Sequence, residues 1–176
     1  MKVQIVYASI SGCTQKLAYA IYNSIKADEK SIHNLKDGEP ELDGDIILLG
    51  YWGISGGPCD VVKKYLKSIK NKAVGVFCTL GYYADSTHAF DTVKCGVDLL
   101  KDNNEIIGSF VCNGAISAEL KGDVPSIPAE QKHIRWEITD NHPTQNECNL
   151  AAERFNERIY LYKRCKDLNI SFTSII

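Results

Sequence analysis

The amino-acid sequence predicts one α/β domain in which a doubly wound parallel sheet carries helices on both faces. Apolar, β-branched runs alternate with amphipathic helical segments from end to end of the chain, and this alternation is typical of parallel α/β architectures. Several of the apolar runs end in glycine-containing loops, as strands do at the ligand-binding edge of such a sheet. With 176 residues and no low-complexity linker, we expect one domain over residues 1–166 and a C-terminal tail over 167–176.

Five runs have the composition of strands. The four main runs are Val3–Ala8, Asp45–Tyr51, Ala73–Thr79 and Ile106–Cys112, and a shorter edge strand is expected at Ser31–Leu35. Interior strands of a parallel sheet are apolar on both sides, because helices cover both faces. The runs therefore predict five parallel strands.

Three helices are predicted between the strands, because apolar residues recur there at helical spacing. They cover Leu17–Ile25, Val61–Ile69 and Phe90–Leu100. A fourth helix is expected after Pro143, where Thr144 and Glu147 have the spacing of a capping box.

Two segments have no place in this scheme. Residues 113–142 are expected to be irregular, although the segment is long for a connection without secondary structure, and residues 168–176 are apolar. We expect each of them to cover the core or to contact a partner.

The composition excludes several classes of protein. Twenty basic and 22 acidic side chains give a formal net charge of -2, which provides no electrostatic surface for nucleic acid. The longest uncharged stretch, Ile46–Cys59, is broken by four glycines and is shorter than the roughly 18 apolar residues of a membrane span. The chain begins like a strand and lacks the features of a signal peptide, so we expect a cytoplasmic protein that makes no contact with membranes.

The seven cysteines are spaced too far apart for a C-x-x-C redox or zinc motif. Their odd number and the lack of an export signal argue against a disulfide framework. We predict buried, reduced thiols and no metal site.

The loop after the first strand has the chemistry of a phosphate site. It reads Ser9-Ile10-Ser11-Gly12-Cys13-Thr14, with three hydroxyls and a glycine where a helix begins. A phosphate there would meet free backbone N–H groups, the positive end of the helix dipole and hydroxyls, without a lysine or a metal. The alternative is that these hydroxyls cap the helix.

Two further loops combine aromatic residues with glycines. They read Tyr51-Trp52-Gly53-Ile54-Ser55-Gly56-Gly57-Pro58 and Thr79-Leu80-Gly81-Tyr82-Tyr83. Their aromatic side chains offer flat faces to a stacked ring, and the glycines let the backbone approach the ring edge. The alternative is that aromatic residues at strand ends plug the core.

These residues together resemble a known family. The start of the chain, Ile5-Val6-Tyr7-Ala8-Ser9-Ile10-Ser11-Gly12-Cys13-Thr14, is similar to that of flavodoxins, whose phosphate loop reads T/S-x-T/S-G-x-T, and the later loops fit the same family over about residues 1–165. The resemblance implies a flavodoxin-like five-stranded parallel sheet with strand order 2-1-3-4-5. It also implies FMN as cofactor, with the phosphate in the first loop and the isoalloxazine between the second and third.

A narrower resemblance rests on the segments Gly50-Tyr51-Trp52, Thr79-Leu80-Gly81, Ile107-Gly108-Ser109-Phe110 and His142-Pro143. They are similar to those of a short-flavodoxin subgroup linked to bilirubin reduction. The chain departs from the family in two ways. Cys13 stands where asparagine is frequent, and the strongly acidic character of freely diffusing carrier flavodoxins is missing.

The expected FMN-binding residues come from all three loops, and no catalytic residue is assigned. They are Ser9, Ile10, Ser11, Gly12, Cys13, Thr14, Tyr51, Trp52, Gly53, Thr79, Leu80, Gly81 and Tyr82. His88, at the start of a predicted helix, is read as a surface group.

Other classes with related folds lack their motifs here. A response-regulator receiver needs carboxylates where this chain has Ser9 and Tyr51. Neither the P-loop motif nor the dinucleotide motif G-x-G-x-x-G follows the first strand. The one match to the cysteine-phosphatase pattern, Cys148 to Arg154, lies inside an amphipathic helix.

Three functions stay open at this point. The first is an electron-transfer flavoprotein that serves a reductase partner, with bilirubin or another tetrapyrrole as the compound reduced. The second is an FMN-dependent reductase that acts directly on a small organic substrate, and the third is a flavin-free scaffold that binds a partner through residues 113–142. A ring held against Trp52 or Tyr82 with few cations nearby would have a lowered reduction potential.

Overall fold

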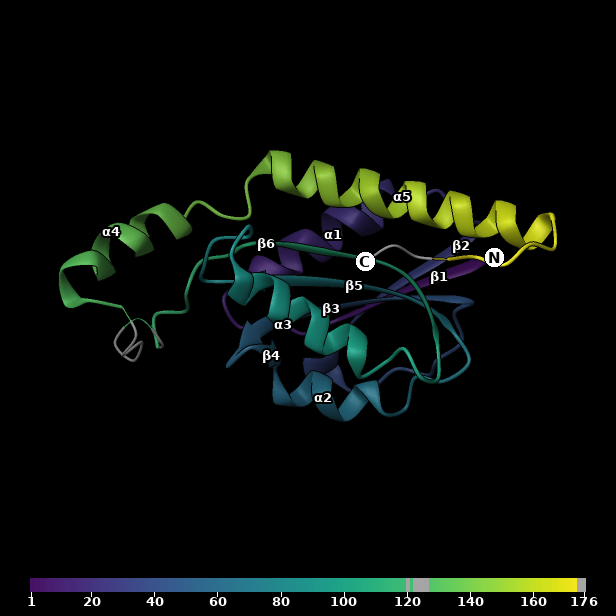
Figure 1. Ribbon diagram of the computed structural model, residues 1–176, viewed down its shortest axis with the longest axis horizontal. Helices are drawn as coiled ribbons and strands as arrows, with labels where there is room; N and C mark the ends of the chain where they lie inside the picture. Colours follow the sequence, from purple (N-terminus) through teal and green to yellow (C-terminus); the bar gives the residue numbers. More distant parts are fainter. Residues whose placement is uncertain (120, 122–126, 174–176) are drawn as a thin grey trace.

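The computed structural model describes residues 1–119, 121 and 127–173 of the chain. Figure 1 shows a central sheet with α1 (Cys13–Ser24) and α5 (Gln145–Asp167) on one face and α2 (Asp60–Leu66) and α3 (Thr87–Asp98) on the other. A further helix, α4 (Ala129–Thr139), lies outside these layers, beyond one end of the strands.

Five strands form the parallel sheet, as the sequence predicts. They are β1 (Lys2–Tyr7), β2 (Glu29–Asn34), β3 (Ile46–Ile54), β5 (Ala73–Leu80) and β6 (Glu105–Asn113). Their order is β2-β1-β3-β5-β6, and every pairing among them is parallel. The predicted fold class and strand order are therefore confirmed.

Alternate side chains of each central strand pack into two separate hydrophobic cores, one on each face of the sheet. Ile5 of β1 and Leu48 of β3 pack in the cluster beneath α1 and α5, whereas Val6 and Leu49 pack in the cluster beneath α2 and α3. Because successive side chains of a strand point to opposite faces, a strand that is covered on both sides is apolar at most positions. The exception in β1 is Gln4, which is buried with its side-chain amide hydrogen-bonded to the backbone of Glu41 and Gly44.

The structure adds a short strand that the sequence did not predict. β3 continues to Ile54 and pairs with β4 (Gly57–Pro58) in an antiparallel hairpin. The two turn residues, Ser55 and Gly56, have φ angles of 50° and 77°, and such left-handed turns match the twist of the strands that they join. A hairpin therefore replaces most of the second predicted loop, and a 3-10 turn at Leu35–Asp37 follows β2.

The expectation that residues 113–142 are irregular is wrong for α4. This helix is anchored by Trp136 and Thr139, which are buried, while Ile134 and Ile138 are exposed. Residues 120 and 122–126 of the segment lie outside the described residues. In the predicted tail, Phe172 is buried with its ring 5.6 Å from that of Tyr162, and residues 174–176 lie outside the described residues.

The predicted capping box at the start of α5 is present. The Thr144 hydroxyl accepts a hydrogen bond from the Glu147 backbone N–H at 3.2 Å, and the Glu147 carboxylate accepts one from the Thr144 backbone N–H at 2.6 Å. The carboxylate also lies 2.7 Å from Nδ1 of His142. Burial raises the pKa of Glu147, but the hydrogen bonds from Thr144 and His142 outweigh it, so the pKa falls below its ordinary value of 4.5.

We expect Glu147→Gln to lower the free energy of unfolding by about 1 kcal/mol at pH 7, because a charge-assisted hydrogen bond is lost. A carboxylate whose pKa is lowered by folding stabilises the protein above its unfolded-state pKa, and this contribution is lost as the pH falls through the folded-state pKa. The cost of Glu147→Gln should therefore shrink progressively below pH 4.5. Urea denaturation at several pH values measures it, with the exposed Glu153→Gln on the same helix as control; a cost independent of pH would contradict the interpretation.

Candidate functional site

A cavity of about 670 Å³ lies at the carboxyl edge of the sheet. Eight of the thirteen predicted site residues line it. They are Ile10, Ser11, Trp52, Gly53, Thr79, Leu80, Gly81 and Tyr82. The three loops that the sequence singled out therefore meet in one place, as the carboxyl ends of parallel strands do.

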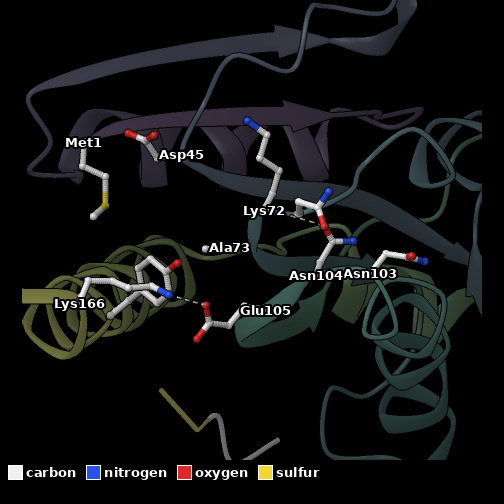
Figure 2. A pocket seen from close by; sticks show the side chains of 10 residues that line it. Met1, Asp45, Lys72, Ala73, Asn103, Asn104, Glu105 and Lys166 are labelled. Carbon is white, nitrogen blue, oxygen red and sulfur yellow. Dashed lines mark hydrogen bonds and ion pairs between the residues drawn. The ribbon is translucent and has the colours of Figure 1, made fainter. Parts of the chain in front are cut away.

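A larger hollow, of about 870 Å³, lies at the opposite, amino edge of the sheet. Figure 2 shows its side chains, with Lys166 turned toward Glu105. These two groups form an ion pair at 3.0 Å, and the ammonium group of Lys72 donates to the Gly44 carbonyl at 2.8 Å. Because these charges already have partners within the protein, the cavity at the carboxyl edge is the better candidate site.

The N-terminus of α1 has no side-chain cap. Its N-cap is Gly12, in the left-handed region with φ +86°, and no side chain among the described residues caps the helix by a hydrogen bond. The interpretation that the hydroxyls of this loop cap the helix is therefore wrong. The hydroxyl of Ser9 is buried and has no hydrogen-bond partner among the described residues, and the first N–H groups of any helix lack partners inside the helix.

Lysine plays no part in this loop. The ammonium group of Lys16, on the first turn of α1, donates to the Pro143 carbonyl at 2.5 Å. The loop is left with backbone N–H groups, the helix dipole and the hydroxyls of Ser9 and exposed Ser11 as its anion-binding groups.

Thr14 and Cys13 connect the loop to other segments. The Thr14 hydroxyl is buried 2.8 Å from the Thr79 hydroxyl, so this hydrogen bond links the first turn of α1 to the end of β5. The Cys13 sulfur accepts a hydrogen bond from the Ala115 backbone N–H at 3.1 Å, and the thiol donates to the His142 carbonyl at 3.4 Å. These side chains hold the walls of the site in position, and neither of them lines the cavity.

Tyr51 and Trp52 are adjacent residues of β3 with different degrees of burial. Tyr51 is fully buried in the core beneath α2 and α3, and its hydroxyl donates to the Thr92 carbonyl at 3.1 Å. Burial raises its pKa far above the ordinary value. The expectation that Tyr51 presents its ring to a ligand is wrong, because this ring fills the core, while half-buried Trp52 lines the cavity.

Tyr82 is held by three neighbours. Its ring lies 5.7 Å from that of Tyr83 and 5.8 Å from that of His88, both edge-on, and the Arg135 guanidinium lies 5.5 Å from its centroid. Edge-to-face contacts and a cation over a ring are both favourable. These contacts fix the orientation of Tyr82 at the cavity.

A fourth wall of the cavity was missed by the sequence analysis. It comes from the segment after β6 and from α4, and His88 of α3 adds to it. The residues are His88, Gly114, Ala115, Ile116, Ser117, Ile127 and Arg135. A Cβ atom on Gly81 would lie 2.2 Å from Cγ1 of Ile116, so glycine is required where this wall meets the third loop. In the sequence, this wall could have been predicted only from the apolar residues Ala115 and Ile116, which follow the last strand.

All seven cysteines are free, and six of them are buried, as predicted. Cys95 departs from the prediction, because it is only partly buried. Burial raises the pKa of the Cys78 and Cys112 thiols, so both stay protonated. Among the described residues, no group of three or more His, Cys, Asp or Glu side chains could hold a metal ion. Within the same part of the chain, no helix combines the length and apolar character that a membrane crossing needs.

The fold and the site define a doubly wound α/β protein with a cavity at the carboxyl edge of its parallel sheet. A family model described as a flavodoxin domain matches residues 4–156. The flavodoxin-like domain-containing protein BilS of Clostridioides difficile (strain CD3) is 31% identical over 153 residues, or 83% of this chain and 86% of BilS. The chain belongs to the flavodoxin family.

Solved structures show the same fold at lower identity. The flavodoxin of Fusobacterium nucleatum, bound to flavin mononucleotide, matches with a TM-score of 0.58 at 17% identity, over 93% of this chain and 97% of that one. Oxidised flavodoxin 2 of Bacillus cereus matches with a TM-score of 0.59 at 20% identity, over 90% and 99% of the two chains.

The assignment of Tyr51 to the core and of Trp52 to the cavity can be tested by stability. Tyr51→Ala should lower the free energy of unfolding by about 3–5 kcal/mol, because it leaves a large cavity in the core. Trp52→Ala should cost about 1–2 kcal/mol, since the indole is only half-buried. Tyr51→Phe, expected to cost about 1 kcal/mol for the lost hydroxyl bond, keeps the comparison usable if Tyr51→Ala fails to fold. Denaturant unfolding measures all three variants, and a larger cost at Trp52 would reverse the assignment.

Proposed function

We propose that the protein binds FMN and passes electrons to a reductase partner. The observation that carries the proposal is the start of α1, which has no side-chain cap. Left-handed Gly12 and the Ser9 hydroxyl, which has no partner in the part of the chain that the structure describes, form a site suited to a phosphate monoester. The bound flavin mononucleotide of the Fusobacterium nucleatum flavodoxin, a protein of the same fold, supports this choice of ligand.

The residues of the cavity fit the two ends of FMN. Backbone N–H groups of residues 11–14 and the hydroxyls of Ser9 and Ser11 would hold the phosphate. The ring system would lie between Trp52 and Tyr82, near the backbone of Gly53 and Gly81. When bound, FMN supplies one- and two-electron chemistry, while the protein orients it and sets its electrostatic environment.

An apolar rim around the cavity fits a protein partner. The exposed side chains of Ile10, Ile54, Tyr83 and Phe90 come from the loops and helix start at this edge, and Phe90 is 63% exposed. Leu80, which lines the cavity, is buried and contributes little to such a surface. With a formal net charge of -2, docking on this rim would depend on short-range apolar contacts.

The compound finally reduced is proposed to be bilirubin or another tetrapyrrole. This extension rests on the sequence resemblance to the subgroup linked to bilirubin reduction and on the 31% identity to BilS. The cytoplasmic location stays a prediction.

A second function is favoured by one observation. The cavity extends beyond the three loops to Ile127 and Arg135, so it has lining residues that FMN binding by the loops does not use. Direct reduction of a small organic substrate at the flavin would use them. Oxidation of NAD(P)H by the isolated holoprotein with such a substrate would favour this function over the carrier.

We expect Gly12→Val to abolish FMN binding while the apoprotein stays folded. Valine is strained at φ +86°, by about 1–3 kcal/mol, and relief of this strain would turn the N–H groups of the loop away from the phosphate. Gly38→Val is the matched control, because Gly38 also has a positive φ, of +120°, with open space around it, and lies outside the cavity. Quenching of flavin fluorescence measures FMN and riboflavin binding, and equal affinity of the unmodified protein for the two flavins would contradict the phosphate site.

Electron transfer to the reductase partner should depend little on ionic strength. We expect the rate to change by less than about threefold between about 50 and 300 mM salt, since the small net charge gives little steering beyond a Debye length of about 10 Å. Stopped-flow mixing of reduced protein with the partner measures this rate. A tenfold fall over the same range would indicate a charged docking patch, and Phe90→Ser with an unchanged rate would exclude the apolar rim.

A further inference from the structure

The cavity contains a cationic group that the proposed FMN site does not use. Arg135 of α4 lines the cavity, as do Ile116 and Ile127. The phosphate loop lies at the start of α1, on a different element, and its anion-binding groups are backbone N–H groups and hydroxyls.

The guanidinium of Arg135 has donors to spare. One terminal nitrogen donates to the Gln131 side-chain oxygen at 3.1 Å, and the guanidinium carbon lies over the Tyr82 ring, 5.5 Å from its centroid. Among the described residues, no carboxylate lies within ion-pair distance of it. An arginine has five N–H donors in a planar fork, so most of them are available to a ligand in the cavity.

The position of Arg135 is fixed from two sides. Buried Trp136 and Thr139 anchor α4, and the Tyr82 ring supports the guanidinium, itself held edge-on by Tyr83 and His88. A preorganised guanidinium loses less freedom when it binds an anion than a free side chain does.

The surroundings of Arg135 select the kind of anion. Ile116 and Ile127 add apolar side chains to the lining of the same cavity. Ser117 also lines it, and its hydroxyl is buried without a hydrogen-bond partner among the described residues. A phosphate carries up to two charges and is strongly hydrated, so one guanidinium in a cavity that isoleucines also line suits it poorly. A carboxylate matches the fork with two parallel hydrogen bonds and leaves an apolar body to the isoleucines.

We propose that the part of the cavity lined by Arg135, Ile116 and Ser117 binds a small apolar molecule that carries a carboxylate. Arg135 is the anchor of the carboxylate, and the Ser117 hydroxyl is a second polar contact. The inference rests on the proposed function, since it names the ligand class admitted beside the flavin. Arg135 acts here as a binding residue, and the site has no element in common with the phosphate loop.

The test compares a carboxylate with its neutral isostere. The holoprotein is titrated with 4-phenylbutyrate and with 4-phenylbutyramide, by calorimetry and by the change in the visible flavin spectrum. We expect the carboxylate to bind at least about tenfold more tightly, because the neutral amide cannot form the charge-assisted pair. Equal binding of the two probes, or binding of neither, would overturn the proposal.

Variants assign the preference to Arg135. Arg135→Gln should reduce the carboxylate-to-amide ratio to about one, whereas Arg135→Lys, which keeps the charge, should keep a ratio above one. Arg154→Gln is the matched control, because it makes the same change of charge at an exposed position of α5 outside the cavity. An Arg135→Gln protein that kept the full ratio would exclude this site.

The same experiment separates the two proposals. The visible spectrum of the purified protein reports bound FMN, and the ratio of the two probes is measured within each variant. A protein without FMN that still prefers the carboxylate would contradict the flavin function and support the anchor. A protein with FMN and no preference would contradict the anchor alone.

Discussion

The parallel pairing of β1, β3, β5 and β6 is the constraint on which the site depends. Because these strands run in one direction, each of their carboxyl ends delivers a loop to the same edge, however far apart the loops lie in sequence. The hydrogen bond between the Thr14 and Thr79 hydroxyls, 2.8 Å long, links the first turn of α1, which follows the phosphate loop, to the end of β5, which precedes an aromatic loop. A shift of register between the strands would separate the phosphate loop from the aromatic loops.

The sequence predicted what local rules determine. Strands covered on both faces are apolar at most positions, which made Val3–Ala8 and its counterparts recognisable despite Gln4. The spacing of Thr144 and Glu147 predicted the start of α5. The sequence could not show which of the two aromatic side chains, Tyr51 or Trp52, is buried in the core. Both faces of β3 are apolar, so the alternation of side chains does not say which aromatic residue enters the core.

The fourth wall of the cavity, formed by α4 and the segment after β6, was not predicted for a different reason. Within α4, only Trp136 and Thr139 are buried, so the helix has no broad apolar face for a periodicity argument to detect. Its place is set by contacts distant in sequence, such as that of Arg135 with Tyr82. The absence of a side-chain cap on α1 was likewise invisible, because Ser9, Ser11 and Thr14 are all residues that commonly cap helices.

The two hydrogen bonds of the Cys13 thiol join the first turn of α1, the wall at Ala115 and the approach to α5 at His142. The phosphate loop and the cavity wall at Ala115 are therefore both held by the side chain of Cys13. A ligand that ordered residues 114–117 would also restrict the N–H groups at the start of α1, and a phosphate that ordered that turn would restrict the wall in return. By linkage such an effect would be reciprocal: occupancy of either end of the cavity would change the affinity of the other end by the same factor.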